Sequence, residues 1–410
     1  MDEANRRGQQ MRLVVPGDRT RTEEVGSFGR IYYIEAPRAP MNPGYRVIYP
    51  HRYLLPGTAL QRILNEEQPD LVEISEKYSM PWFAGLLRTG RLPGVRLRPT
   101  VVGLSCERMD ENVAAYLTHS LQGRRFCAWY MKWVYFPMFD HHITVSPHVA
   151  GELIDASKGH KVRRGIWTAP MGVDCERFTP VKRSDKLREE LRSKVGAPAG
   201  ATLLLYAGRL AREKNLSLLV ETMARLEGEN YWLTIAGDGQ CKGELQAQFA
   251  RHGVRHVTFL GHVGDKETLA EYYANADVFI HPNPREPFGI APLEAMASGL
   301  PMVAPNSGGV TEYANGSNAW LVAADGEAFA DAVRSIRGNP TETGKRMLAA
   351  RQTAEMFRWQ AAASRYLDLY REIHEITTGQ RDAKKTTAVW STTGNAFGRE
   401  TKSNKIVASL

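Results

Sequence analysis

The feature that most constrains the fold of this chain is a repeated order of apolar strand, glycine turn and helix in its second half. Three short apolar runs, each stopped by a glycine, carry the pattern over residues 202–206, 231–236 and 257–260. Short apolar runs bounded by glycine are typical of strands that are buried on both faces, as in parallel sheets covered by helices. Parallel sheets bind ligands at the carboxyl ends of their strands. The sequence therefore predicts an α/β fold with a binding site in the loops after these strands.

A second segment, over residues 283–294, places Glu286 before and Glu294 after a Pro-Phe-Gly turn that leads into a helix. Pro292 suits a helix start, where its missing N–H would be unpaired anyway, and Gly299 ends the helix. A helix N-terminus attracts an anion such as a diphosphate, which two carboxylates would repel unless they face uncharged hydroxyl groups. A sugar nucleotide supplies both kinds of group. Two solvated surface carboxylates are the alternative interpretation.

Cationic side chains follow the first of the three predicted strands. Arg209 and Lys214 lie at the opening of an amphipathic stretch over residues 216–226. Guanidinium and ammonium groups at this position can contact phosphate oxygens. The Gly-Asp-Gly sequence over residues 237–239 is weaker evidence, because it suits any tight turn.

In combination, these motifs resemble the retaining family-4 glycosyltransferases of the GT-B fold, in which two Rossmann-like domains face a cleft. The resemblance covers about residues 5–376, and its motifs are Gly208-Arg209-Leu210 with Glu213-Lys214, Ala236-Gly237-Asp238-Gly239, Phe259-Leu260-Gly261-His262-Val263, Glu286-Pro-Phe-Gly to Glu294, Ser307-Gly308-Gly309 with Glu312, Pro170-Met171-Gly172-Val173-Asp174 and Phe178-Thr179-Pro180. It implies transfer of a hexose, of mannose or glucose type, from a GDP- or UDP-linked sugar with retention of configuration. The acceptor would be a hydroxyl on a glycolipid or polysaccharide precursor.

The resemblance also implies residue roles, with Glu286, Arg209 and Lys214 as the catalytic set. Glu286 would contact hydroxyls of the transferred sugar, Arg209 and Lys214 would hold the diphosphate, and Glu294 would bond the ribose. The other donor-binding positions would be Phe288, Gly289, Ile290, Gly208, Gly237, Asp238, Gly239, His262 and Val263. Fixed cations and a helix N-terminus stabilise charge on the leaving diphosphate, so neither a metal nor a cofactor is expected.

The acceptor side of the sequence is less specific. A predicted strand over residues 99–104 ends at Cys106, Glu107, Arg108 and Asp110, which are candidate acceptor contacts. An inert cysteine and a salt-bridged loop explain these residues equally well. The adjacent His141 and His142 would point to opposite faces of a strand, so we do not expect them to share a metal ion.

Residues 121–139 interleave arginine and lysine with phenylalanine, tyrosine and tryptophan. Such a mixture can lie on an anionic membrane, with rings at the interface and cations near the headgroups. The favoured interpretation is a partly buried helix whose aromatic face packs on the sheet.

Four parts are expected along the chain. They are an acceptor-binding Rossmann-like domain over residues 1–178, a nucleotide-sugar domain over 179–355, a closing helix over 356–378 that returns to the first domain, and a disordered basic tail over 379–410. Residues 6–15 look like the end of the first helix and the second strand of the family's N-terminal sheet. The first strand and its glycine-rich loop are missing, which predicts a truncated N-terminal domain or a misplaced start.

Composition bounds the function classes. The chain has 410 residues, 43% of them hydrophobic and 24% charged, which is typical of a globular protein with room for two cores. Four cysteines without metal spacing, and no signal peptide or apolar run long enough to span a bilayer, favour the cytoplasm, with peripheral membrane contact as a further expectation. A net charge of +8 without a recognition module argues against nucleic acid.

Two other functions compete with glycosyl transfer. A hydrolase or epimerase would act on the sugar nucleotide alone, and a non-catalytic sugar-nucleotide-binding protein would keep only the donor site. A conspicuous acid/base pair that activates water would favour the hydrolase, and the missing first strand and Cys106 favour the non-catalytic protein.

Overall fold

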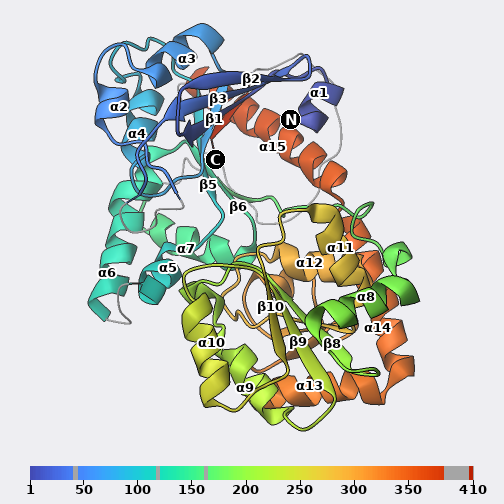
Figure 1. Cartoon of the computed structure of the whole chain (residues 1–410). Coiled ribbons are helices and arrows are strands. Elements are labelled where there is room, and N and C mark those ends of the chain that lie inside the picture. The colour runs from blue at the N-terminus through green and yellow to red at the C-terminus, as the bar shows by residue number, and fades with distance from the viewer. Residues whose placement is uncertain (40–44, 117–120, 161–164, 383–405, 410) are drawn as a thin grey trace. The chain divides into compact units, whose positions relative to one another are not determined.

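The computed structural model describes residues 1–39, 45–116, 121–160, 165–382 and 406–409. The chain forms two compact units (Figure 1). Unit 1 comprises Met1–Asp110, Ser120–Ala169 and Ala363–Leu410, and unit 2 comprises Glu111–His119 and Pro170–Ala362. Among the described helices, none combines the length and the apolar character needed to cross a bilayer.

The described part of unit 1 contains an eight-stranded sheet in the order β2-β3-β1-β14-β4-β5-β6-β7. Its strands are β1 (Met11–Gly17), β2 (Arg21–Val25), β3 (Gly29–Glu35), β4 (Leu71–Ile74), β5 (Thr100–Ser105), β6 (His141–Thr144), β7 (Ile166–Thr168) and β14 (Ile406–Ser409). Neighbouring strands run parallel, apart from the antiparallel pair of β2 and β3.

Helices surround this sheet. They are α1 (Asp2–Arg6), α2 (His51–Leu54), α3 (Ala59–Glu67), α4 (Pro81–Thr89), α6 (Leu121–Tyr130), the π-helical turn η1 (Met131–Tyr135), the 3-10 turn η2 (Phe136–Met138), α7 (Pro147–Ser157) and, from Ala363 onward, α15 (Trp359–Asp382). Helix α5 (Met109–Tyr116) is divided between the units.

Helix α15 contributes to the core of unit 1. Its side chains Leu367, Tyr370 and Ile373 form one buried cluster with residues of α1, β4, β5 and β6. The same helix also contacts a buried carboxyl group. The Tyr366 hydroxyl donates a hydrogen bond to Glu73 of β4 at 2.6 Å. Burial raises the pKa of Glu73 to about 7, and the tyrosine hydroxyls of α15 counteract burial only in part.

Strand β14 lies in the centre of the sheet, between β1 and β4. Its backbone pairs in parallel with β1 on one side and β4 on the other, with Val407 opposite Arg12 and Val72. The predicted disorder of the tail is therefore wrong for residues 406–409, and for residues 379–382, which continue α15. Residues 383–405 and 410 lie outside the described part. The physical reason is that an open central slot would leave the N–H and C=O groups of two buried strands unpaired.

Unit 2 contains a six-stranded parallel sheet in the order β10-β9-β8-β11-β12-β13 among its described residues. Its strands are β8 (Thr202–Ala207), β9 (Tyr231–Ala236), β10 (Val257–Gly261), β11 (Val278–Ile280), β12 (Met302–Pro305) and β13 (Trp320–Val322). The strands predicted over residues 202–206, 231–236 and 257–260 are thus confirmed to within one residue. The apolar character of both faces explains why the short runs were sufficient to identify them.

Helices cover both faces of this sheet (Figure 1). The elements are α8 (Asp185–Val195), α9 (Ser217–Arg225), α10 (Lys242–Arg251), α11 (Lys266–Asn275), α12 (Ile290–Ala297), α13 (Gly326–Gly338), α14 (Pro340–Met356) and the 3-10 turns η3 (Pro180–Lys182), η4 (Arg212–Lys214) and η5 (Gly309–Glu312). Helix α9 contacts both α10 and α13 over one face, and over the other α11 contacts α8 and α12, while α12 contacts α14. The main core cluster joins β8 and β9 to α9, α10 and α13.

The central position of β14 leads to a prediction about stability. Val407→Pro removes an N–H from a strand that is paired on both sides, and we expect the free energy of unfolding of unit 1 to fall by roughly 1–3 kcal/mol. Val407→Ile keeps the N–H and the branched side chain and serves as the control. Denaturant unfolding, followed by hydrogen exchange to separate the two units, measures the difference. Equal stability of the two variants would show that β14 does not hold the sheet together.

Candidate functional site

The order of strands in unit 2 reverses beside β8. From β8 the chain moves outward to β9 and β10, and it then returns to β11 on the other side of β8 before moving outward again to β12 and β13. In open parallel sheets, ligands bind beyond the carboxyl ends of the strands at such a reversal, because the two connections leave in opposite directions. The candidate site therefore lies where the loops after β8 and β11 begin.

An ion pair joins these two loops. Lys214, at the end of η4, donates from Nζ to both oxygens of Glu286, at 2.8 Å to Oε2 and 3.2 Å to Oε1. The next residue, Asn215, has left-handed backbone and donates from its amide to the Pro282 carbonyl at 3.0 Å. The loop after β8 thus holds the loop after β11 through one side chain and through one carbonyl.

Two further side chains surround the Glu286 carboxylate, which is only 9% exposed. Asn283 donates to Oε2 at 2.9 Å, and Nε2 of the buried His281 lies 3.6 Å from the same oxygen. Burial raises the pKa of Glu286, but Lys214, His281 and Asn283 together outweigh burial and hold this pKa below its ordinary value. Burial lowers the pKa of His281 to about 4, so its imidazole is neutral at pH 7.

Sequence reasoning missed His281 and Asn283. Both follow β11 directly and alternate with Pro282 and Pro284 in the same segment as Glu286. The signal that could have found them is this alternation, since extended residues two apart share a side.

The Pro-Phe-Gly turn brings the start of α12 to the site. Gly289 is the N-cap of the helix, and its φ of 92° is a conformation that favours glycine. The Tyr313 hydroxyl donates to the carbonyls of Phe288 and Gly289 at 3.1 and 2.5 Å, which fixes the turn. Pro292 has no N–H, and the Leu293 N–H donates to the Gly289 carbonyl at 3.4 Å, so the N–H groups of Ile290 and Ala291 are those without an acceptor within the helix. These two groups can receive an anion.

The glycine pair Gly308-Gly309, which follows β12, packs against the same turn. The Gly309 N–H donates to the Glu286 carbonyl at 2.6 Å, and the Ser307 hydroxyl donates to the Pro284 carbonyl at 3.0 Å. A Cβ on Gly309 would overlap the Pro287 carbonyl. The Ser-Gly-Gly sequence is therefore required by a close approach of two loops.

Glu294 lies in the second turn of α12, which starts at Ile290. Burial raises the pKa of Glu294 to about 7, and the Tyr273 hydroxyl and the Lys266 ammonium lower it only in part. Glu286 is thus ionised at neutral pH, whereas Glu294, which has no cation within salt-bridge distance among the described residues, titrates near neutrality.

The other predicted donor residues lie in the loops after β8, β9 and β10. Arg209 is 45% exposed on its side chain and pairs with Glu213 at 2.6 Å. Gly208 and Gly237 approach each other so closely that a Cβ on Gly237 would overlap the Gly208 carbonyl. Asp238 accepts from the Gly239 N–H at 2.7 Å.

After β10, His262 is exposed and Val263 is half-buried. The structure places both at the same edge of the sheet as Asp238.

The candidate acceptor residues of unit 1 form a salt-bridged loop. Arg108 pairs with Asp110 at 2.8 Å and also donates to the His148 carbonyl at 3.1 Å, while Cys106 is exposed. The Glu107 carbonyl accepts from the ammonium of Lys77.

A buried ion pair supports this loop. Lys77 and Glu152 are almost fully buried and lie 3.0 Å apart, and Glu152 also accepts from the Asp110 N–H at 3.0 Å. Sequence reasoning did not find this pair, because 75 residues separate its members.

Both histidines that follow one another on β6 are buried and have protein partners. His141 Nδ1 accepts from the Gly165 N–H at 3.1 Å, and His142 Nε2 lies 3.1 Å from the Phe136 carbonyl.

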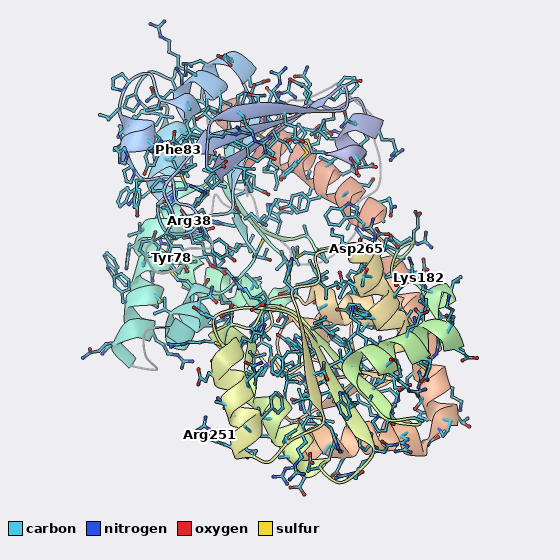
Figure 2. All side chains as sticks on the ribbon, viewed as in Figure 1. Arg38, Tyr78, Phe83, Lys182, Arg251 and Asp265 are labelled. Atoms are coloured by element: carbon cyan, nitrogen blue, oxygen red, sulfur yellow. The ribbon has the colours of Figure 1, made fainter. Side chains whose placement is uncertain are left out.

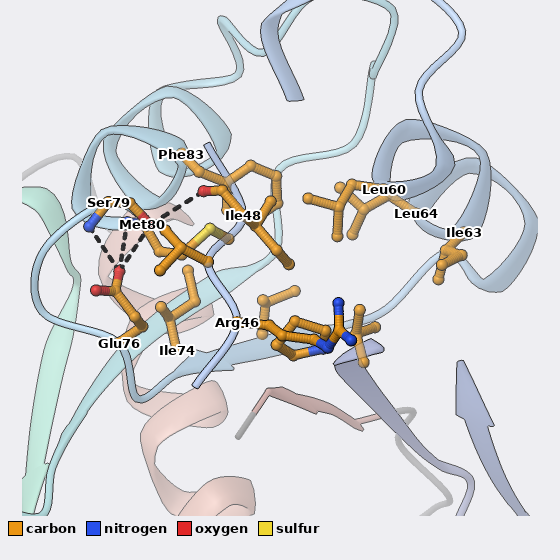
Figure 3. Close-up of a pocket in the computed structure, with 14 residues that line it drawn as sticks. Arg46, Ile48, Leu60, Ile63, Leu64, Ile74, Glu76, Ser79, Met80 and Phe83 are labelled. Atoms are coloured by element: carbon orange, nitrogen blue, oxygen red, sulfur yellow. Dashed lines mark hydrogen bonds between the residues drawn. The ribbon is translucent and has the colours of Figure 1, made fainter. Parts of the chain in front are cut away.

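Unit 1 also contains an apolar cavity of about 70 Å³ (Figure 3). Side chains of β1, β4, α3 and α4 line it together with Arg46, Glu76 and Ser79. The carboxylate of Glu76 accepts from the N–H groups at the start of α4, including that of Ser79 at 2.7 Å, and Arg46 donates to the Ala36 carbonyl at 2.5 Å. The polar groups of Glu76 and Arg46 at the cavity thus already form hydrogen bonds with the protein backbone.

Comparison with known proteins assigns both halves of the chain. The family model described as Glycosyltransferase Family 4 matches residues 1–177, and the model described as Glycosyl transferases group 1 matches residues 187–353. A GDP-mannose-dependent alpha-(1-6)-phosphatidylinositol dimannoside mannosyltransferase of Mycobacterium tuberculosis is 30% identical over 362 residues, which cover 88% of this chain and 87% of the relative.

Two further proteins are similar to the chain. A GDP-mannose-dependent alpha-mannosyltransferase of Corynebacterium glutamicum is 29% identical over 321 residues, covering 77% of this chain and 69% of the relative. The solved structure of sucrose-phosphate synthase from Thermosynechococcus elongatus superposes with a TM-score of 0.71 at 22% identity, covering 91% of both chains. The structural likeness bears on the fold.

The close approach at Gly309 leads to a prediction that tests the site's architecture. Gly309→Ala forces the two loops apart, and we expect the free energy of unfolding of unit 2 to fall by roughly 1–3 kcal/mol. Gly316→Ala is the matched control, because a Cβ there meets no atom within 4 Å, and its effect should stay within about 0.5 kcal/mol. Denaturant titration of both variants gives the comparison, and equal losses would contradict the interlocked loops.

Proposed function

Because this chain belongs to the family-4 glycosyltransferases and has the GT-B fold, we propose that it transfers a hexose from a nucleotide diphosphate sugar to an acceptor hydroxyl. The observation that carries the proposal is the Lys214–Glu286 ion pair at the reversal of the strand order, beside the N-terminus of α12. It brings a cation, an ionised carboxylate and unpaired amides to one place. The diphosphate and the sugar of a donor need these three kinds of group.

The diphosphate is proposed to bind at Lys214 and the first turn of α12. An ammonium has three N–H donors, and Glu286 takes two of them, so one is left for a phosphate oxygen. Arg209 can join by exchanging Glu213 for phosphate, since an exposed ion pair contributes little free energy and is readily broken. These groups stabilise the charge that develops on the leaving diphosphate more strongly than that of the bound donor.

The hexose is proposed to lie against Glu286 and His281. The ionised carboxylate accepts hydrogen bonds from sugar hydroxyls, and Lys214 and Asn283 hold it in one orientation. Nε2 of His281 has no hydrogen-bond partner among the described residues and faces the same oxygen of Glu286. A hydroxyl bound between the two would satisfy both groups, which supports a polar ligand here.

In the proposed reaction, the bond between the anomeric carbon and the diphosphate oxygen breaks and a bond to the acceptor oxygen forms. The acceptor's proton passes to the leaving diphosphate, so the products are the glycoside and the nucleoside diphosphate. We expect the anomeric configuration to be retained.

GDP-mannose is the first donor to test, because two relatives are named as GDP-mannose-dependent enzymes. The name of the first relative also specifies a phosphatidylinositol glycolipid as acceptor. A lipid-borne acceptor is therefore proposed, and UDP-linked hexoses are the alternative donors.

A donor screen tests the proposed function. Purified protein is incubated with GDP-mannose, GDP-glucose, UDP-glucose and UDP-galactose, each with and without a lipid extract, and release of nucleoside diphosphate is measured. Release that depends on the extract, with GDP-mannose preferred, is expected. Release without any acceptor would instead indicate a hydrolase, and donor binding without release would indicate a non-catalytic binding protein.

The charge state of Glu294 leads to a further prediction. If ribose hydroxyls donate to its carboxylate, donor binding lowers the pKa of Glu294 from about 7, so a proton is released and affinity rises between about pH 6 and pH 8. Glu294→Gln should weaken donor binding by roughly 1–3 kcal/mol and abolish this proton release. Titration calorimetry in two buffers of different ionisation enthalpy measures it.

The variant also separates Glu294 from other titrating groups. His281 titrates well below this range. Unchanged affinity and proton release in the variant would remove Glu294 from the ribose site.

A further inference from the structure

One helix of unit 1 carries large aromatic side chains on its outer face. Phe126, Trp129 and Trp133, on α6 and η1, are 56%, 53% and 57% exposed. Their spacing of three and four residues places them in one row. Phe126 and Trp129 stack with ring centroids 6.1 Å apart.

The opposite face of the same helix fills the core. Cys127, Met131 and Tyr135 are buried, and Tyr135 packs against Phe139 with ring centroids 5.0 Å apart. The interpretation that the aromatic face packs on the sheet is therefore wrong for the outer row. The inner face already supplies the packing that the sheet requires.

Positive charge flanks the aromatic row. Residues 121–135 contain Arg124, Arg125 and Lys132 and no Asp or Glu. Both arginines are exposed, and the Lys132 ammonium lies 5.3 Å from the centre of the Trp133 ring.

A second pair of aromatic side chains lies close to the helix. Tyr78 (labelled in Figure 2) and Trp82 are both more than half exposed. The hydroxyl of Tyr130, on α6, donates to the Lys77 carbonyl at 2.8 Å, which ties the segment before α4 to this helix. The exposed side chains of Tyr78 and, on α4, Trp82 therefore belong to the segment that this hydrogen bond joins to α6.

We propose that this surface, formed by Tyr78, Trp82, Phe126, Trp129 and Trp133 with Arg124, Arg125 and Lys132, binds the anionic headgroup region of a lipid bilayer. Aromatic rings prefer the boundary between headgroups and acyl chains, and cations beside them attract anionic lipid. The inference deepens the proposed function, because it rests on a lipid-borne acceptor and says where the protein meets the membrane that contains it.

Charge argues against two other occupants. A second copy of the chain would place three cations against three cations with no carboxylate in the helix to offset them. Residues 383–405 contain five Lys or Arg and one Glu, so this segment does not complement a basic surface either. An anionic bilayer complements both the rings and the charge.

Vesicle flotation of the full chain tests the proposal. The chain should bind vesicles of phosphatidylcholine mixed with phosphatidylglycerol, bind phosphatidylcholine alone more weakly, and dissociate as salt rises. Arg124→Glu with Arg125→Glu should weaken binding at least about tenfold, since each basic residue near an anionic surface contributes measurably. Trp129→Ser with Trp133→Ser should weaken binding to both kinds of vesicle.

Matched controls lie in unit 2. Arg251→Glu with Arg255→Glu reverses two exposed arginines elsewhere (Arg251 is labelled in Figure 2), and Leu348→Ser removes an exposed apolar side chain. Both controls should bind vesicles as the unmodified chain does. Equal losses in control and patch variants, or patch variants that lose self-association instead of vesicle binding, would overturn the proposal.

Two measurements keep the inference separate from folding defects and from the proposed function. In the unmodified chain, brominated phosphatidylglycerol should quench tryptophan fluorescence on vesicle binding, and absence of quenching would overturn the proposal without any variant. Nucleoside diphosphate release with a short-chain, water-soluble glycolipid should be unchanged in the Arg124→Glu, Arg125→Glu variant. Vesicle binding without any transferase activity would contradict the proposed function and leave the membrane surface standing.

Discussion

The constraint on which the candidate site depends is the reversal of strand order between β8 and β11. It places the end of η4 beside the segment after β11, so Lys214 reaches Glu286 although 72 residues separate them. The loop after β12 then closes the arrangement, because the Gly309 N–H binds the Glu286 carbonyl. Three loops from three adjacent strands thus hold one carboxylate by its side chain and by its backbone. The sheet supplies the rigidity that none of the loops has alone.

The two glutamates differ because of what each one contacts. Glu286 is buried more deeply than Glu294. Its pKa is nevertheless below the ordinary value, because Lys214 and Asn283 donate hydrogen bonds to its carboxylate oxygens. Glu294 has only a tyrosine hydroxyl and a lysine to counteract burial, and its pKa is about 7. Under the proposed function, Lys214 offsets the negative charge of Glu286, and Glu294 becomes ionised only where ribose hydroxyls donate to it, so repulsion of the diphosphate stays small.

Much of unit 2 could be predicted from the sequence because its local signals agree with one another. The predicted strands match β8, β9 and β10 closely, and the Pro-Phe-Gly turn does lead into α12. The ion pair of Lys214 with Glu286 could not be derived from spacing, since it depends on which strands are neighbours. The buried pair of Lys77 and Glu152 in unit 1 was missed for the same reason.

The end of the chain shows where composition misleads. A segment rich in Lys, Thr, Ser and Asn has too little apolar surface to fold by itself, which is why disorder was predicted over 379–410. The strand itself is the apolar run Ile406-Val407-Ala408 followed by Ser409, and it pairs its backbone groups with two neighbours, β1 and β4. The average composition of the tail hides such a short apolar run, although the run is long enough to form a central strand.

The prediction for helix α6 was wrong for a different reason, because this helix has apolar side chains on two faces. The rule that the apolar face of a helix packs inward cannot choose between the row of Phe126 and Trp129 and the row of Cys127 and Met131. The size and charge of the side chains decide which face is buried. The smaller side chains of Cys127 and Met131 fit the densely packed interior. Burying the aromatic row would require burying the cationic residues beside it as well. The cost of burying those cations keeps the larger rings outside, where a charged bilayer surface can satisfy rings and cations together.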